Sequence, residues 1–303
     1  MAELPIIDVS ALRSELEEGN PDLQKLCNQV KEAVQQWGAF RVVNHGVEQE
    51  LLNAVDSVSR DLFNLPPQVK ERAVNLPLDG YSKGISLSIG EAMCIPVVPP
   101  SDSLQQYAHK FWPQGNSEFC DSLRTYSSKL TDLVNSLIKL ILRGLGLSKH
   151  FEIDFTECDA LLCLNYFSEY ENPSDANDIV LREHKDLGVI SILYNDQVGG
   201  LQMRTKQGEW FSVKPLASSF TVIIADALKM WSNDRCWSVE HRVAYEGKNP
   251  RLSVVFLWKF LKEKEVCAPD ELIDEHHPRR YKPFLFKDYV NHQIKGDPLD
   301  IFL

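Results

Sequence analysis

The sequence predicts an α+β protein in which helices pack on a sandwich or jelly-roll core. The first half of the chain has apolar residues at helical spacing, for example Leu23, Leu26 and Val30. The second half has short β-branched or aromatic runs that recur at intervals of roughly 8 to 14 residues. Gly, Asn, Asp or Pro separate these runs without a helical pattern between them, which favours such a core over a parallel sheet.

Three helices are expected in the first half of the chain, at residues 21–37, 48–63 and 118–147. Asn20 is a suitable N-cap for the first helix, and Gly144 and Gly146 would end the third. Strands are expected at residues 39–43, 161–167, 189–194, 201–204, 210–213, 220–224, 237–243 and 252–258. Five prolines bracket or interrupt residues 78–113, so we expect an irregular segment there, either a lid or binding loop or a variable surface excursion.

Composition and charge restrict the class of protein. The chain has 303 residues and a net charge of −11, which argues against binding to nucleic acid or to an anionic membrane, because both depend on clustered Lys and Arg. No apolar run reaches the roughly 18 residues that span a bilayer. Residues 1–8 lack the basic start and apolar stretch of a secretory signal. We therefore expect a cytoplasmic protein that binds a small molecule, and the acidic charge is compatible with a monomer.

The seven cysteines are scattered, odd in number and never spaced as C-x-x-C. A disulfide framework or a structural zinc site would need tighter organisation. We therefore expect buried or incidental thiols in a reducing compartment, most simply the cytosol.

Two potential metal ligands, His184 and Asp186, lie two residues apart. In an extended stretch, positions i and i+2 project to the same face, so both side chains can reach one point. His241 lies on the strand expected at residues 237–243, and a jelly roll that folds back on itself can bring it to the same point. Two histidines and one carboxylate leave the other side of a metal open, which suits iron(II) that binds a co-substrate and O2 together.

Arg251 and Ser253 form a second pair on one face of an expected strand. An arginine grips a carboxylate with two hydrogen bonds, and a serine hydroxyl donates a further one. The pair therefore suits the distal carboxylate of a dicarboxylic acid whose other end chelates the metal. The alternative is a surface salt bridge beside Pro250, but a guanidinium in so apolar a strand needs a buried partner.

The order of these motifs resembles that of plant-type 2-oxoglutarate- and iron(II)-dependent dioxygenases. H-x-D is followed by a second His with Arg after it, and R-x-S begins ten residues after that His. Further motifs that resemble those of the family are Trp37-Gly38-Ala39-Phe40, Val43-Asn44-His45-Gly46-Val47, Asn165-Tyr166, Gly199-Gly200-Leu201-Gln202, Trp231-Ser232-Asn233, Ser238-Val239-Glu240-His241-Arg242-Val243, Ala268-Pro269 and His277-Pro278. The resemblance covers nearly the whole chain, and the branches most similar are the dioxygenases for auxin oxidation and the alkenyl-glucosinolate-forming group.

The resemblance implies a double-stranded β-helix (jelly-roll) core at residues 156–262, with a mostly helical N-terminal region at 1–155 and a C-terminal tail at 263–303, in a single compact domain. It implies that His184, Asp186 and His241 are the catalytic iron ligands. It also implies that Arg251, Ser253 and Asn165 hold the co-substrate. The implied cofactor is Fe(II), the co-substrates are 2-oxoglutarate and O2, and ascorbate is the expected reductant.

The implied activity is oxidation of a small hormone-like or specialised plant metabolite by hydroxylation, desaturation or demethylation. Substrate contacts are expected from Tyr81, Met93, Phe111, Trp112, Phe167 and Leu257. For the aromatic residues in this set, packing in the core is the alternative interpretation.

Two departures from the family's motifs leave alternatives open. Phe167 stands where the family usually has a tyrosine that reaches the co-substrate carboxylate, so the alternative function is a catalytically weakened member that binds or senses a small molecule. Lys185 stands where the family usually has threonine, and it either meets an acidic substrate or points to solvent. A third interpretation is a cupin-like zinc hydrolase or isomerase, in which Arg251 and Ser253 would lack a purpose.

Overall fold

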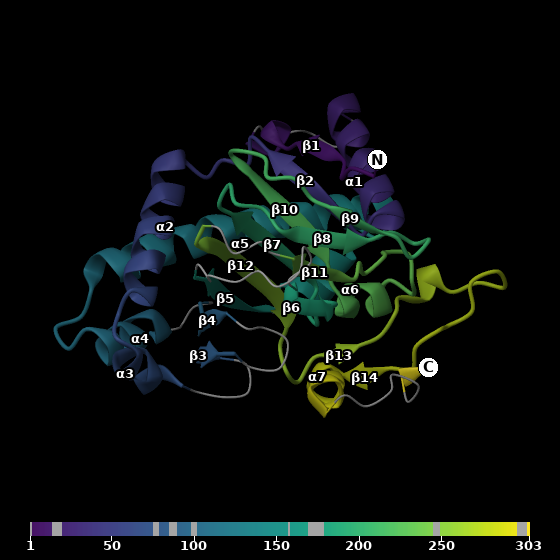
Figure 1. Ribbon diagram of the computed structural model, residues 1–303. Helices are drawn as coiled ribbons and strands as arrows, with labels where there is room; N and C mark the ends of the chain where they lie inside the picture. The colour runs from purple at the N-terminus through teal and green to yellow at the C-terminus, as the bar shows by residue number, and fades with distance from the viewer. Residues whose placement is uncertain are drawn as a thin grey trace.

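Two β-sheets lie at the centre of the computed structural model (Figure 1), which describes residues 2–13, 20–74, 79–84, 90–97, 102–156, 158–168, 179–244, 249–295 and 302–303. Among these residues, eight strands form a major sheet in the order β1 (Ile6–Asp8), β2 (Ala39–Val43), β10 (Ser219–Ile224), β7 (Ile190–Asn195), β12 (Arg251–Phe260), β5 (Cys158–Phe167), β4 (Glu91–Pro96) and β3 (Gly80–Lys83). A minor sheet has the order β6 (Ile179–His184), β11 (His241–Ala244), β8 (Leu201–Arg204) and β9 (Trp210–Ser212). Neighbouring strands are antiparallel except β1 and β2.

Helices pack on the major sheet, which confirms the predicted α+β class with a jelly-roll core. The longest helix, α5 (Ser117–Leu145), packs against α1 (Pro21–Gln36) and α2 (Gln49–Phe63) and contacts β7 and β12. A short helix, α6 (Asp226–Trp231), lies between β10 and β11 along the chain. The remaining segments are η1 (Ser10–Arg13), α3 (Pro67–Lys70), η2 (Glu71–Ala73), α4 (Ser103–Phe111), η3 (Phe151–Phe155), β13 (Glu265–Val266), η4 (Asp270–Leu272), β14 (Phe284–Leu285) and α7 (Phe286–Lys295).

The alternation of side chains along β12 separates the two faces of the major sheet. Val254 and Phe256 are fully buried in the main core, between the sheet and the helices. Arg251, Ser253 and Val255 point to the other face, where a cavity lies between the two sheets. One strand therefore contributes to the core on one side and to the candidate site on the other.

Most predicted elements are confirmed, with bounds that differ by a few residues. Helices α1, α2 and α5 and strands β2, β5, β7, β8, β9, β10 and β12 lie where the sequence pattern predicts them. The side chain of Asn20 accepts hydrogen bonds from the backbone N–H groups of Asp22 and Leu23, as expected of an N-cap. Gly146 ends α5 in the left-handed conformation, with a φ of 77°.

Two predictions of local structure are wrong. Residues 78–113 contain β3, β4 and α4, because β4 gains backbone hydrogen bonds from both β3 and β5 that its own sequence does not predict. The strand expected at 237–243 begins only at His241, and the backbone N–H of Trp237 bonds instead to the carbonyl of Val34 at the end of α1. Helix α6 and strand β6 have no counterpart in the prediction, because both are short and depend on their tertiary partners.

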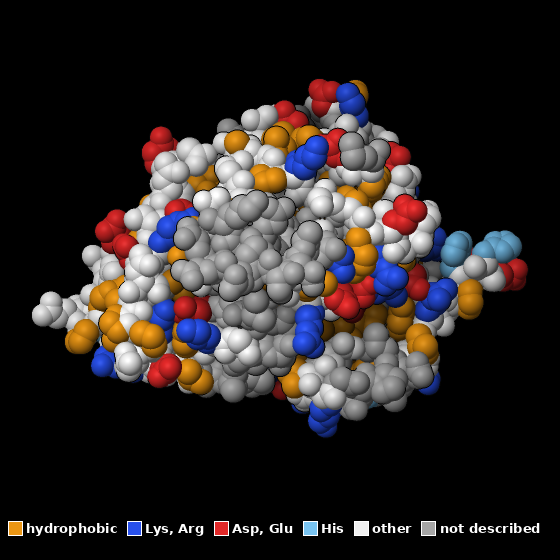
Figure 2. Space-filling model, in the orientation of Figure 1, with side chains coloured by type: hydrophobic (Ala, Val, Ile, Leu, Met, Phe, Trp, Pro, Cys, Tyr) orange, Lys and Arg blue, Asp and Glu red, His pale blue; other side chains and the backbone are white. Residues whose placement is uncertain are grey.

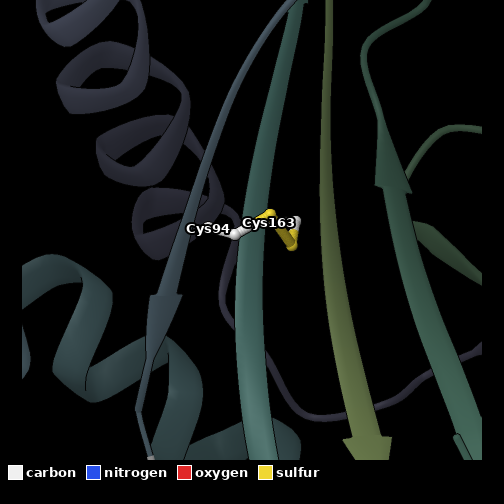
Figure 3. Close-up of a disulfide and its surroundings, with 2 residues drawn as sticks. All are labelled: Cys94 and Cys163. Carbon is white, nitrogen blue, oxygen red and sulfur yellow. A yellow bond between two sulfur atoms is a disulfide. The ribbon is translucent and has the colours of Figure 1, made fainter. Parts of the chain in front are cut away.

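A disulfide between Cys94 and Cys163 corrects the expectation that every cysteine is a free thiol. The two residues lie opposite each other on the antiparallel strands β4 and β5 (Figure 3). They are 69 positions apart in the sequence, so only the pairing of the two strands brings them together. The free cysteines are Cys27, Cys120, Cys158, Cys236 and Cys267.

The described surface carries both signs of charge. Figure 2 shows acidic and basic side chains interspersed over one face, with no broad basic patch among the residues drawn in colour there. None of the helices in the described part of the chain is long and apolar enough to cross a membrane.

Replacing Gly38 by alanine should destabilise the protein strongly. Gly38 joins α1 to β2 with a φ of +65°, and a Cβ there would lie 2.4 Å from the carbonyl oxygen of Trp237. Gly84 is a matched control, because its φ is +61° but a Cβ would meet nothing within 4 Å. We expect Gly84→Ala to lower the free energy of unfolding by about 1 kcal/mol and Gly38→Ala by at least about 3 kcal/mol, measured by urea denaturation. Equal losses would contradict the steric explanation.

Candidate active site

Three potential metal ligands meet at one end of the minor sheet. His184 ends β6, and His241 begins β11 directly opposite it. Asp186 follows two residues after β6, and its Oδ1 lies 3.9 Å from Nε2 of His184 and 3.8 Å from Nε2 of His241. One ligand atom from each residue lies within 4.8 Å of the others. Two imidazole nitrogens and one carboxylate oxygen, gathered in this way, are the donor set that suits non-haem iron(II).

Each histidine is oriented through its other ring nitrogen. Nδ1 of His184 lies 2.8 Å from the carbonyl oxygen of Arg182, and Nδ1 of His241 lies 3.3 Å from that of Val239. Because a carbonyl oxygen only accepts, Nδ1 carries the proton in each ring, and Nε2 keeps its lone pair for a metal. Burial, and to a lesser extent the neighbouring ring of His184, lowers the pKa of His241, which keeps that ring neutral at physiological pH.

Asp186 is held through both its side chain and its backbone. The hydroxyl of Ser191, a buried residue on β7, donates a hydrogen bond of 2.6 Å to Oδ2 of Asp186. The backbone N–H of Asp226, the first residue of α6, donates to the backbone carbonyl of Asp186. Oδ2 is therefore engaged by Ser191, while Oδ1 faces the two histidines and is available to a metal.

The opposite end of the same cavity holds a buried guanidinium. Arg251 is only 1% exposed, and its nitrogens donate to Oγ of Ser253, to Oδ1 of Asn195 and to the carbonyl oxygen of Gly199. Asn165 lies opposite Ser253 in the register of β5 and β12. Arg251, Ser253 and Asn165 line the cavity of about 190 Å³ that also contains the three potential metal ligands. The potential metal ligands and a guanidinium suited to a carboxylate therefore line one cavity.

The ring of Phe167 lies beside this guanidinium. Phe167 is opposite Arg251 in the strand register, and its ring centroid is 5.7 Å from the guanidinium carbon. The ring also packs with Val180 and Val243. A phenyl ring cannot donate the hydrogen bond that a tyrosine would, but it provides an apolar wall and a cation–π contact at this end of the cavity.

Four residues predicted to contact substrate lie outside the cavity lining. Tyr81, Met93 and Phe111 are buried in the main core on the helical side of the major sheet, and Trp112 packs against that core. Along β4, Met93 points to the helices and the next residue, Cys94, points to the cavity, because successive side chains alternate. These four residues are therefore not among the described residues that line the cavity.

Two other residues predicted to contact substrate lie in the cavity lining. Phe167 and Leu257 line the cavity together with the potential metal ligands. Lys185 does not belong to the described lining, and its Nζ lies 5.9 Å from the ring centroid of Trp237. The structure therefore does not support contact of Lys185 with a substrate inside this cavity.

Part of the cavity lining was not anticipated from the sequence. These residues are Cys94, Cys163, Leu181, Leu193, Leu201, Ile223, Val243 and Val255. Cys163 and Val255 share a face with Asn165 and Ser253, so the period of two along each strand contained a signal for them. Leu181 and the other residues of the minor sheet could not be found in this way, because the sequence pattern does not show how that sheet lies over the major one.

A jelly roll with this donor set and a buried arginine characterises the non-haem iron(II) oxygenases that use 2-oxoglutarate. The family model of the 2OG-Fe(II) oxygenase superfamily matches residues 158–259. The model of the N-terminal region of non-haem dioxygenases in morphine synthesis matches residues 4–114.

Two relatives from Arabidopsis thaliana extend this match over almost the whole chain. Jasmonate-induced oxygenase 2 is 32% identical over 298 residues, which is 94% of this chain and 78% of the relative. Probable 2-oxoglutarate-dependent dioxygenase AOP1 is 29% identical and is matched over 95% of this chain and 96% of its own length. The chain belongs to the 2OG-Fe(II) oxygenase superfamily. It is therefore a dioxygenase that uses iron(II) and 2-oxoglutarate, as the resemblance implied.

Solved structures agree with this assignment. The dioxygenase for auxin oxidation from rice superposes with a TM-score of 0.80 at 27% identity, over 97% of this chain and 96% of that chain. JOX2, crystallised in complex with 2OG, Fe and JA, superposes with a TM-score of 0.82 at 29% identity, over 96% of this chain and 84% of that chain.

Loss of the Ser191 hydroxyl should weaken metal binding. Ser191→Ala removes the hydrogen bond that holds Oδ2 of Asp186, so we expect the dissociation constant for Fe(II) or Mn(II), measured anaerobically by calorimetry, to rise by roughly 10-fold or more. Ser191→Thr keeps the hydroxyl and should stay within about threefold of the unmodified protein. Wild-type affinity in Ser191→Ala would show that Ser191 does not orient the ligand.

Proposed function

We propose that this protein oxidises a small, largely apolar metabolite at an iron(II) centre held by His184, Asp186 and His241. The single observation that supports this most strongly is the shared cavity, in which these three residues and the Arg251–Ser253 pair line one space. In the proposal, Arg251 and Ser253 bind the distal carboxylate of 2-oxoglutarate, and Asn165 contributes a further polar contact. When bound, iron with 2-oxoglutarate and O2 supplies the oxidising equivalents, and succinate and CO2 are the co-products.

The remaining walls of the cavity suggest the chemical class of the substrate. Apart from the residues assigned to iron and 2-oxoglutarate, the described lining consists of apolar side chains and two cysteines. Apolar walls favour a substrate with a hydrocarbon or aromatic body. Relatives named for jasmonate and solved structures named for auxin oxidation support a hormone-like or specialised plant metabolite of this kind. Phe167 and Leu257 are proposed substrate contacts.

The alternative of a binding or sensing protein rests on Phe167 and is less well supported. The donor set for iron is complete, and the relatives include proteins named as oxygenases and dioxygenases. We further propose that the enzyme acts as a monomer in the cytosol, supported by its acidic net charge and by the five cysteines that remain free thiols.

Formation of succinate tests the proposed function. The protein with Fe(II), 2-oxoglutarate and ascorbate in air should release succinate, and a panel of small carboxylic acids, including an auxin and a jasmonate, should identify compounds that raise the rate. His184→Ala should lose this activity, because one of the three iron donors is gone. If the folded, iron-loaded protein forms no succinate, either alone or with any compound of the panel, the enzyme proposal is refuted. If His184→Ala remains active, the assignment of His184 as an iron ligand is refuted.

Arg251→Lys separates co-substrate binding from metal binding. Lysine keeps the charge but loses the planar fork that grips a carboxylate, so we expect KM for 2-oxoglutarate to rise by about 10-fold or more while the affinity for Mn(II) stays unchanged. Arg242→Lys is the matched control, because Arg242 lies outside the described lining and donates to the side chain of Gln202. An unchanged KM in Arg251→Lys would show that 2-oxoglutarate binds elsewhere.

A further inference from the structure

The Cys94–Cys163 disulfide forms part of the wall of the catalytic cavity. Both residues line the same space as His184, Asp186 and His241. Cys163 is two residues from Asn165 on the cavity face of β5 and lies opposite Val255 of β12. Figure 3 shows the bond crossing from β4 to β5, with the next strands of the sheet beside it. The disulfide is therefore adjacent to the groups proposed to bind the co-substrate, not in the main core.

This pair differs from the other cysteines in position and reactivity. Cys94 is only partly buried, and the open space beside its sulfur is the cavity itself. Cys158 and Cys236 are buried, and burial raises the pKa of each thiol to about 12, so they stay protonated at neutral pH. Cys27 and Cys120 are buried as well, and burial raises the pKa of both. Cys94 and Cys163 thus form a disulfide in the cavity wall, whereas these four buried cysteines lie outside the described lining.

The strand that carries Cys94 is near the edge of the major sheet. The sheet ends with β5, β4 and β3, so β4 has no sheet beyond β3 to support it among the described strands. Hydrogen bonds to β3 and β5, burial of Met93 and Ile95 in the main core, and the disulfide hold β4 in place. Opening the disulfide removes the covalent link between β4 and β5, and segments near the edge of a sheet open locally more often than central strands.

We propose that Cys94 and Cys163 are a reversible thiol/disulfide modification site that controls how firmly β4 closes one wall of the catalytic cavity. In the reducing direction, two molecules of a small thiol such as glutathione give up two electrons and two protons and become one glutathione disulfide. The first thiolate attacks Sγ of Cys94, the bond to Cys163 breaks, and the second thiol releases Cys94 from the mixed disulfide. The product has two free thiols, and oxidised glutathione reverses the reaction.

The inference that this wall meets the substrate rests on the proposed function. The potential iron ligands lie on or beside β6 and β11, and Arg251 and Ser253 lie on β12, so none of them is on β4. A change in β4 therefore leaves the assigned iron ligands and Arg251 in place and alters the wall beside them, which Asn165 of β5 also borders. A cytosolic enzyme with this site would present a loosened wall under reducing conditions and a closed wall under oxidative conditions.

Two measurements that need no catalysis test the proposal. The protein is first equilibrated in a series of glutathione buffers from reducing to oxidising, and the exchange is quenched with acid. It is then unfolded and its free thiols are alkylated with N-ethylmaleimide. Mass spectrometry of the cysteine peptides shows which cysteines were thiols in each buffer. We expect Cys94 and Cys163 to change together between dithiol and disulfide, while the other cysteines remain thiols. Hydrogen exchange of β4 amides should then be about 10-fold faster in the reduced protein, with no change in β7, a central strand.

Matched variants make the result specific. Cys94→Ser and Cys163→Ser should each exchange at β4 like the reduced protein in every buffer, whereas Cys267→Ser, away from the cavity, should respond like the wild type. If Cys94 and Cys163 label as free thiols even in the oxidising buffer, or resist glutathione in the folded protein, the modification site is refuted. If the pair changes state but β4 exchange does not, control of the wall is refuted. Neither measurement involves iron, 2-oxoglutarate or succinate, so failure of the proposed function would be seen separately.

Discussion

The register between β5 and β12 is the constraint on which the catalytic cavity depends. The two strands pair over ten positions each, from Arg251 opposite Phe167 to Phe260 opposite Cys158. Because side chains alternate along a strand, a slip of one residue would turn the polar groups of β12 into the main core and its apolar residues into the cavity. Burial of Val254 and Phe256 against the helices opposes such a slip, since exposing them would cost on the order of 2 kcal/mol each. The core therefore determines where Arg251 points.

The metal end of the cavity depends on contacts that cross between elements. Asp186 receives the hydroxyl of Ser191 from β7 and its backbone carbonyl receives the N–H of Asp226 from α6. Asp226 in turn accepts a hydrogen bond from the hydroxyl of Tyr289 on α7. This chain of contacts links α7 to the metal ligand through the buried Asp226, and the buried Ser191, on β7, holds the same ligand separately. Hydrogen bonds of this kind hold a ligand in the orientation that a metal requires before the metal arrives.

The cavity combines two requirements that conflict in most protein interiors. A buried arginine and three metal ligands need polar partners, and Arg251 finds them in Ser253, Asn195 and the carbonyl of Gly199. The rest of the lining is apolar apart from the two cysteines, which favours an apolar substrate. The Cys94–Cys163 bond lies at the border between these two regions and is the one covalent link between neighbouring strands of this wall in the described chain.

Much of the site could be predicted from the sequence because its motifs are local. His184 and Asp186 are two residues apart, as are Arg251 and Ser253, and extended backbone brings such pairs to one face. Arg251 and Ser253 both lie in β12, whereas Asp186 lies just beyond the end of β6. Helices α1, α2 and α5 could be predicted for the same reason, because their apolar spacing is a property of each segment alone. The part of the cavity wall formed by β4 could not be predicted from the sequence. The segment at 78–113 has weak periodicity, and its two strands form only when β5 offers a partner.

The sequence by itself determined the fold class, the family, the donor set and the residues expected to bind the co-substrate, because each depends on residue type and short spacing. Only the tertiary structure decided which side chains face the cavity. Met93 and Cys94 are neighbours in the sequence, yet one lies in the core and the other lines the cavity. The disulfide with Cys163 and the contact of Ser191 with Asp186 likewise arise when strands pair or a loop folds over its neighbour. Residues brought together in this way share no periodicity, and their proximity is a consequence of topology.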